Sequence, residues 1–187
     1  PEFGFNNIPG WMVDEGYMIK MDGASELTLT GEAVPWDYPI SLDAGWQMSS
    51  YYPRQGVEAI LALSGIVDVL LMAKDGQGRF YSPAFEFSNM GNLIPGQGYL
   101  LKMDEAADLV YTVEEELAAQ STPYKQPSFL PVHSGTSENM SLLVLSDFAE
   151  GEIGVSANDN LVGSGVLQDG MCGIAVWGDD PTTSEID

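Results

Sequence analysis

The amino-acid sequence predicts a mainly β protein made of antiparallel sandwich-like or barrel-like modules, with one short helix near residues 57–64. Two observations support this fold class. Short apolar segments alternate along the chain with turns rich in Gly, Pro, Asn and Asp, which is the pattern of short antiparallel strands. In addition, residues 83–109 repeat the sequence of residues 1–27, which indicates a modular architecture.

The repeat has a constant offset of 82 residues and needs no gap. Eleven of the 27 aligned positions are identical, whereas unrelated windows of average composition would share roughly two. The identical pairs include Gly16/Gly98, Tyr17/Tyr99, Lys20/Lys102, Met21/Met103 and Leu27/Leu109. Residues 1–33 are therefore interpreted as the second half of a truncated repeat, residues 34–39 as a proline-punctuated linker, and residues 40–120 as a complete repeat.

Local patterns predict the elements of both copies. A glycine turn followed by an apolar run predicts a strand at 16–21, and the turn before the alternating residues 27–30 makes the two a hairpin. The best helical pattern spans 57–63, with Glu58 in its first turn, where the helix dipole favours an acid. The other strands expected in the complete repeat lie within 42–51, 66–73, 79–81, 99–103 and 109–113.

Three prolines in residues 121–131 predict a linker between domains. Residues 132–187 are expected to form a C-terminal β module, because four apolar segments are separated there by Gly, Asn and Asp turns. The four predicted strands are 141–145, 152–155, 161–167 and 172–177. Trp46 and Trp177 lie in apolar strand patterns and are expected in the core.

The charge balance restricts the classes of partner. The chain carries 28 acidic and 6 basic residues, a net charge of −22. Such a surface repels nucleic-acid phosphates and anionic membranes, so neither is expected as a partner. It attracts cations, and Ca²⁺, which prefers oxygen ligands, is the candidate cofactor. The alternative is that the acidity serves solubility alone.

The candidate calcium ligands are aspartates in turns, because no EF-hand pattern is present. They are Asp179, Asp180, Asp159, Asp22 and Asp104. Adjacent carboxylates repel unless a cation or hydrogen-bond donors offset the repulsion, which favours the pair Asp179 and Asp180. The repeated Asp22 and Asp104 have an alternative role as turn formers that accept hydrogen bonds from backbone amides.

No catalytic motif is recognisable, and we do not expect an enzyme. The single cysteine, Cys172, lies in an apolar segment without basic neighbours, which is typical of a core residue. The single histidine, His133, lies near Pro131 without a nucleophile elbow, so a catalytic triad is not indicated. One cysteine and one histidine are too few for a zinc site.

Aromatic side chains indicate a candidate sugar-binding surface, because exposed rings stack on the faces of sugars. The candidate ligand-binding residues are Trp11, Trp36, Tyr51 and Tyr52. Trp11 and Trp36 lie in expected loops, which makes them the better candidates for exposed rings. The alternative is that these aromatic side chains belong to the core.

Three motifs of the complete repeat stand out, namely LDAGWQMS at 42–49, KDGQGRFYSP at 74–83 and PGQGYLLK at 95–102. Together they resemble the "GWN…GYWIK" modules that recur in tandem in secreted and cell-surface proteins of environmental bacteria. The C-terminal motifs EIGV, LVGSG and CGIAVWGDD, which lie within 152–180, are similar to a β module found beside them. The resemblance implies an extracellular, multi-module, mainly β protein without assigned enzymatic activity, and it transfers no catalytic residue.

These observations lead to two functional hypotheses. The first is a non-catalytic structural or adhesion module, extracellular or at the cell surface, that associates with itself or with neighbouring modules. The half repeat at 1–33 would expose strand edges, and strand addition to a neighbour, with bridging cations, would build a filament. The second is a carbohydrate-binding module of a larger secreted protein. No apolar run reaches the length of a membrane-spanning helix, and no signal peptide is recognisable.

Overall fold

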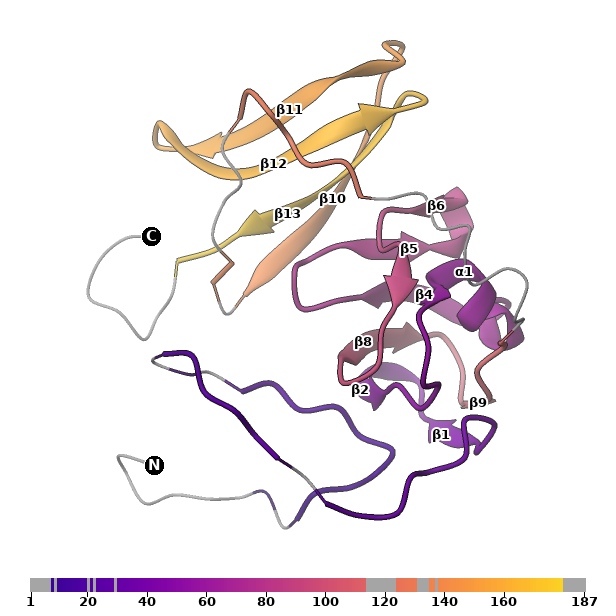
Figure 1. Ribbon diagram of the computed structural model, residues 1–187. Coiled ribbons are helices and arrows are strands. Elements are labelled where there is room, and N and C mark those ends of the chain that lie inside the picture. Colours follow the sequence, from indigo (N-terminus) through magenta and orange to yellow (C-terminus); the bar gives the residue numbers. More distant parts are fainter. Residues whose placement is uncertain are drawn as a thin grey trace.

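The computed structural model describes residues 8, 10–19, 21, 23–28, 30–113, 124–130, 135–136 and 138–179. Within these residues the protein is mainly antiparallel β structure with a single short α-helix, which confirms the predicted fold class. Figure 1 shows two groups of strands. One group comes from the complete repeat, and the other is the C-terminal sheet that lies beside β4, β5 and β6.

The complete repeat forms a five-stranded antiparallel sheet in the order β2-β8-β4-β5-β6 and two small two-stranded sheets, β1-β9 and β3-β7. Its strands are β1 (Ile40–Leu42), β2 (Gly45–Ser50), β3 (Val57–Glu58), β4 (Leu70–Lys74), β5 (Phe80–Ser82), β6 (Phe87–Ser88), β7 (Asn92–Leu93), β8 (Gly98–Met103) and β9 (Ala107–Leu109). Its helices are α1 (Ala59–Ala62) and the 3-10 helices η1 (Ser64–Ile66) and η2 (Pro83–Phe85). Strand β8 is central, because it pairs with β2 on one side and β4 on the other.

The helix is shorter than its sequence pattern predicts. Val57 and Glu58 pair with β7 instead of joining the first turn. Glu58 acts as the N-cap, since its carboxylate accepts hydrogen bonds from the amides of Ile60 at 2.7 Å and Leu61 at 3.1 Å. The strand expected at 66–73 begins only at Leu70, because a 3-10 turn occupies 64–66.

The complete repeat has one continuous core. Its fully buried members include Val57, Leu63, Leu93, Leu101 and Leu109, none of which is more than 1 % exposed. Three tyrosines of this core pack edge to face. The ring centroid of Tyr51 lies 4.9 Å from that of Tyr111 and 6.0 Å from that of Tyr99. The Tyr111 hydroxyl donates to the carbonyl of Ser50 at 2.7 Å.

The C-terminal sheet contains β10 (Asn139–Leu145), β11 (Glu150–Ala157), β12 (Asn160–Gln168) and β13 (Met171–Trp177), in the order β10-β13-β12-β11. All four lie where the sequence predicted strands. The turn between β11 and β12 uses Asn158 and Asp159, and the next one uses Asp169 and Gly170; all four residues have positive φ. Positive φ at both central positions is the geometry that closes a two-residue hairpin. Leu167, Cys172 and Ile174 form a second, smaller core.

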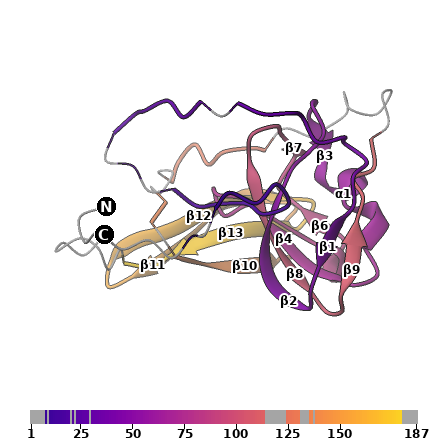
Figure 2. The same ribbon diagram turned by 90° about the horizontal axis from the view of Figure 1, so that it is seen from below.

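The N-terminal copy of the repeat does not form the predicted hairpin. Among its described residues, 16–19, 21, 23–28 and 30 are not in strands. The segment touches the edge of β2 at one bridge, where Glu15 lies opposite Ser49 and the Gly16 amide donates to the carbonyl of Met48 at 3.1 Å. The prediction was wrong because a strand needs a paired neighbour, and this copy has one bridge in place of a sheet. Figures 1 and 2 show the indigo segment as an irregular trace beside the repeat.

A carboxylate ties the segment before the C-terminal sheet to β11. Glu152 accepts hydrogen bonds from the amides of Ser128, Phe129 and Leu130 at 2.6, 2.8 and 3.0 Å, and from the Ser128 hydroxyl at 2.8 Å. Desolvation acts to raise the pKa of Glu152, but these donors outweigh it and lower the pKa to about 2. The four bonds therefore fix the path of residues 128–130.

We expect this attachment to weaken in acid. Because the pKa of Glu152 is about 2 in the folded protein and 4.5 otherwise, its contribution is complete above pH 4.5 and is lost as the pH falls toward 2. NMR shifts of the Ser128, Phe129 and Leu130 amides, followed over this range, would measure the loss. Glu152→Gln should place these amides at their acid positions already at pH 7. Amide shifts that do not change with pH would contradict the role of Glu152 in holding residues 128–130.

Candidate functional site

The N-terminal copy and the complete repeat share one local structure. The Met12 amide donates to the Tyr17 hydroxyl at 2.8 Å, and the Ile94 amide donates to the Tyr99 hydroxyl at 2.7 Å. Met12 and Ile94, like Tyr17 and Tyr99, are separated by 82 positions, so the same turn forms in both copies. The repeat is thus present in the structure as well as in the sequence, at the level of local geometry.

The two copies differ in burial. Five positions that are at most 2 % exposed in the complete repeat are 48 to 61 % exposed in the N-terminal copy. The exposed residues are Ile8, Trp11, Ile19, Met21 and Leu27, and their buried counterparts are Met90, Leu93, Leu101, Met103 and Leu109. We call these five exposed side chains the apolar face. They occupy the repeat positions of core residues, but in the N-terminal copy they are exposed to solvent.

A cleft borders the apolar face. It has a volume of about 590 Å³ and lies between Tyr17, Met18 and Ile19 on one side and Met48 and Leu100 on the other. Asn139, at the start of the C-terminal sheet, also lines the cleft. The N-terminal copy is therefore held to the repeat at its bridge but does not pack against it along its length.

A second concave surface contains two of the predicted aromatic residues. Trp36 and Tyr52 line a groove of about 410 Å³, which we call the aromatic groove. The other lining residues are Ala33, Val34, Pro35, Pro53, Arg54, Gln55 and Val113. Trp36 is 49 % exposed, and Tyr52 is half-buried and meets Tyr38 edge to face, with the ring centroids 6.4 Å apart. The volume falls in the range of small-ligand sites.

The other predicted aromatic residues lie elsewhere. Tyr51 is buried in the core, and its hydroxyl donates to the carbonyl of Gln55 at 3.0 Å, so it presents no ring to a ligand. Trp11 does not line the aromatic groove and belongs to the apolar face. Its counterpart in the complete repeat, Leu93, is a core residue. Trp177 is buried as expected. Trp46 is exposed, which corrects the expectation that it lies in the core, because alternation along β2 points Ser49 inward and Trp46 outward. The Lys102 ammonium nitrogen lies over the Trp46 ring, 5.6 Å from its centroid.

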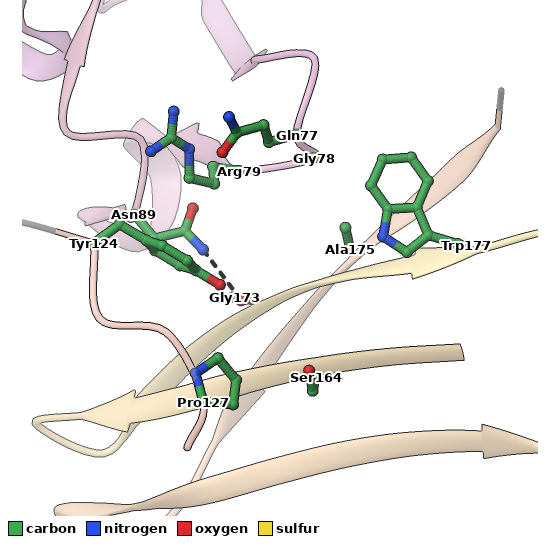
Figure 3. Close-up of a pocket in the computed structure, with 10 residues that line it drawn as sticks. All are labelled: Gln77, Gly78, Arg79, Asn89, Tyr124, Pro127, Ser164, Gly173, Ala175 and Trp177. Carbon is green, nitrogen blue, oxygen red and sulfur yellow. Dashed lines mark hydrogen bonds between the residues drawn. The ribbon is translucent and has the colours of Figure 1, made fainter. Parts of the chain in front are cut away.

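A third site lies where the repeat meets the C-terminal sheet (Figure 3). A cavity of about 60 Å³ separates the turn before β5 from β12, β13 and the segment at Tyr124. The Arg79 and Asn89 side chains in its lining are already engaged. The Arg79 guanidinium pairs with Asp75 and lies 5.7 Å from the Tyr124 ring centroid, and the Asn89 side chain accepts from the Phe80 amide and donates to the Gly173 carbonyl. The size and the engaged groups indicate a joint between two sheets, with space only for water.

Lys74 strengthens the same joint. It is 8 % exposed, and its ammonium donates to the Asn139 side-chain carbonyl at 2.5 Å and lies 3.5 Å from the Asn139 backbone carbonyl. Burial lowers the pKa of Lys74, and the charge of Asp75 opposes this. Lys74 and Asn139 thus connect β4 to β10, while Asn89 connects the loop after β6 to β13.

The candidate calcium ligands do not come together. Within the described part of the chain, no three His, Cys, Asp or Glu side chains gather as they would around a metal ion. Asp159 closes the β11–β12 hairpin with positive φ, and the Asp104 amide donates to the carbonyl of Val69 at 2.8 Å; both side chains are exposed, as is Asp179. Asp22 and Asp180 lie outside the described residues, as does His133.

Cys172 is 1 % exposed, and burial raises the pKa of its thiol to about 11. The thiol is therefore protonated and shielded at neutral pH, which is typical of a structural cysteine. None of the described helices is both long and apolar enough to cross a bilayer.

Sequence reasoning missed two features. The aromatic groove joins residues 33–36, 52–55 and 113, which are distant in sequence, so no local pattern could indicate it. The apolar face could have been found, because the offset of 82 relates each of its residues to a core position in the complete repeat.

No protein-family model, no curated protein and no solved structure matches this chain.

Proposed function

We propose that this chain is a non-catalytic structural or adhesion module, extracellular or at the cell surface, that joins a neighbouring polypeptide through its N-terminal copy by strand addition. The single observation that supports this proposal is the apolar face. Five side chains whose counterparts are at most 2 % exposed are here 48 to 61 % exposed. Large apolar side chains that are exposed at positions occupied by core residues in the other copy favour an interaction surface.

The energetics favour association. Full burial of an exposed apolar side chain of this size contributes about 1.5–3 kcal/mol, and because these five are 48 to 61 % exposed, covering each one would contribute roughly half of that. Ser49 and Glu15 already form one bridge at the edge of β2, which supports β pairing as the mode of contact. The resemblance to tandem "GWN…GYWIK" modules agrees with a protein that works by assembly.

Light scattering tests the proposal on the full chain and on a variant that lacks residues 1–31. The full chain should associate in a concentration-dependent manner, and the deletion should leave a monomer of about the mass of one chain. Equal association of both proteins would refute a role for the N-terminal copy. Repeating the measurement with Ca²⁺ and then with excess chelator tests bridging cations, because a bridged assembly should dissociate on chelation.

The aromatic groove supports a second candidate function, binding of a neutral polysaccharide. Trp36 offers an exposed ring for stacking, and Arg54 and Gln55 offer hydrogen-bond donors beside it. The groove has no carboxylate in its lining, although the chain has 28 acidic residues. The net charge of −22 repels acidic polysaccharides, which favours a neutral ligand.

Trp36→Ala should weaken binding of neutral hexasaccharides by at least about tenfold, because it removes the stacking surface. Trp46→Ala is the matched control, since Trp46 has the same 49 % exposure but lies outside the groove. Isothermal titration with a panel of neutral and uronate hexasaccharides would measure the difference. Equal loss in both variants, or stronger binding of the uronates, would contradict this second function.

A further inference from the structure

The strand pairing of the complete repeat defines what the N-terminal copy lacks. Every strand in its second half pairs with a strand of its first half, residues 40–82. Strand β6 pairs with β5, β7 with β3, β8 with β2 and β4, and β9 with β1. The apolar residues of the second half are buried by these pairings and by the core that forms between the two halves.

Residues 1–187 contain two second halves and one first half. The first half is already paired with residues 83–109. A second copy of residues 1–187 brings the same ratio, so these residues cannot complete the N-terminal copy without unpairing their own repeat. Self-association can therefore cover the apolar face only partly, along the edge of β2 beyond its single bridge with Glu15.

We propose that the partner of the N-terminal copy is an unpaired first half of the same repeat, a segment with the sequence pattern of residues 40–82. This inference rests on the proposed function and names the partner for it. The segment would supply one strand on each side of residues 16–21, as β2 and β4 do for β8, and a strand for residues 25–27, as β1 does for β9. It would also bury Ile19, Met21 and Leu27, which match three core residues.

Local geometry in the N-terminal copy is ready for this partner. The Tyr17 hydroxyl already accepts the Met12 amide, as Tyr99 accepts Ile94 in the complete repeat. The cleft of about 590 Å³ beside Met18 and Ile19 leaves one side of the segment open. The segment is therefore partly organised before it binds, which reduces the ordering cost of association.

A fusion protein tests the inference. Because the offset is constant, a duplicate of residues 40–82 placed directly before Pro1 reproduces the connection between Ser82 and Pro83. In this fusion, hydrogen exchange at the described residues of 16–28 should slow by at least about 100-fold, as expected when the segment is open 1 % of the time or less. The fusion should also no longer associate with itself. Unchanged exchange would overturn the inference, including the case in which the added segment stays unfolded.

The matched control is the same fusion with Asp at the two added positions that duplicate Leu70 and Ala73, which are buried in β4. It should give no protection. The deletion and the fusion distinguish failure of the proposed function from failure of the partner inference. If deletion of residues 1–31 abolishes association but the fusion gives no protection, the N-terminal copy binds a different partner. If the fusion gives protection but the deletion leaves association unchanged, the partner is correct and the assembly role is not.

Discussion

Leu101→Ala should lower the free energy of unfolding of the complete repeat by about 2–5 kcal/mol. Leu101 is fully buried in β8, between β2 and β4, and the smaller side chain leaves a cavity in the core. Ile19→Ala, the equivalent change in the N-terminal copy, should alter the same free energy by no more than about 0.5 kcal/mol, because Ile19 is 53 % exposed. Urea unfolding followed by far-UV circular dichroism would measure both.

The comparison of Leu101→Ala with Ile19→Ala separates the effect of burial from that of side-chain chemistry. Leu101 and Ile19 occupy the same repeat position and have the same number of side-chain carbon atoms, so their intrinsic chemistry is matched. A loss of more than about 1 kcal/mol for Ile19→Ala would mean that the N-terminal copy packs on the repeat in solution, which would remove the apolar face as a binding surface. Leu109→Ala and Leu27→Ala form a second matched pair, with exposures of 0 and 61 %.

Much of the fold follows from local sequence. The four strands of the C-terminal sheet lie where apolar segments alternate with turn residues, and the turns at Asn158–Asp159 and Asp169–Gly170 fix their ends. Strands β5 and β8 also lie where predicted. These elements were predictable because their strand pattern and their turn chemistry agree.

The remaining features depend on pairing, which a local pattern does not contain. Residues 16–21 and β8 have nearly the same sequence, yet the described residues 16–19 and 21 are not in a strand, because only β8 has neighbours on both sides. The outward position of Trp46 depends on the register of β2, in which Trp46 lies opposite Lys102. Trp36 and Tyr52 were singled out separately, but their common groove depends on how the chain returns past them.

The joint between the sheets carries the second large expected effect. Gly173→Ala should destabilise the C-terminal sheet and its contact with the repeat by about 1–3 kcal/mol. A Cβ atom at Gly173 would lie 2.5 Å from Cε1 of Phe87 and 2.8 Å from Nδ2 of Asn89. Neither neighbour can retreat easily, since Phe87 is 8 % exposed and Asn89 is held by its bonds to Phe80 and to Gly173 itself.

The thiol of Cys172 reports this effect directly. It is the single cysteine, it neighbours Gly173, and it is shielded in the folded protein. Labelling by a thiol reagent should therefore become about 5- to 140-fold faster in Gly173→Ala, which is the expected free-energy change converted to a population of the open form. Gly178→Ala is the control, because a Cβ there meets only the Glu138 carbonyl oxygen at 3.8 Å, an ordinary contact. Equal labelling rates in the two variants would mean that the sheets are not joined at Gly173, and that the repeat and the C-terminal sheet move as separate bodies.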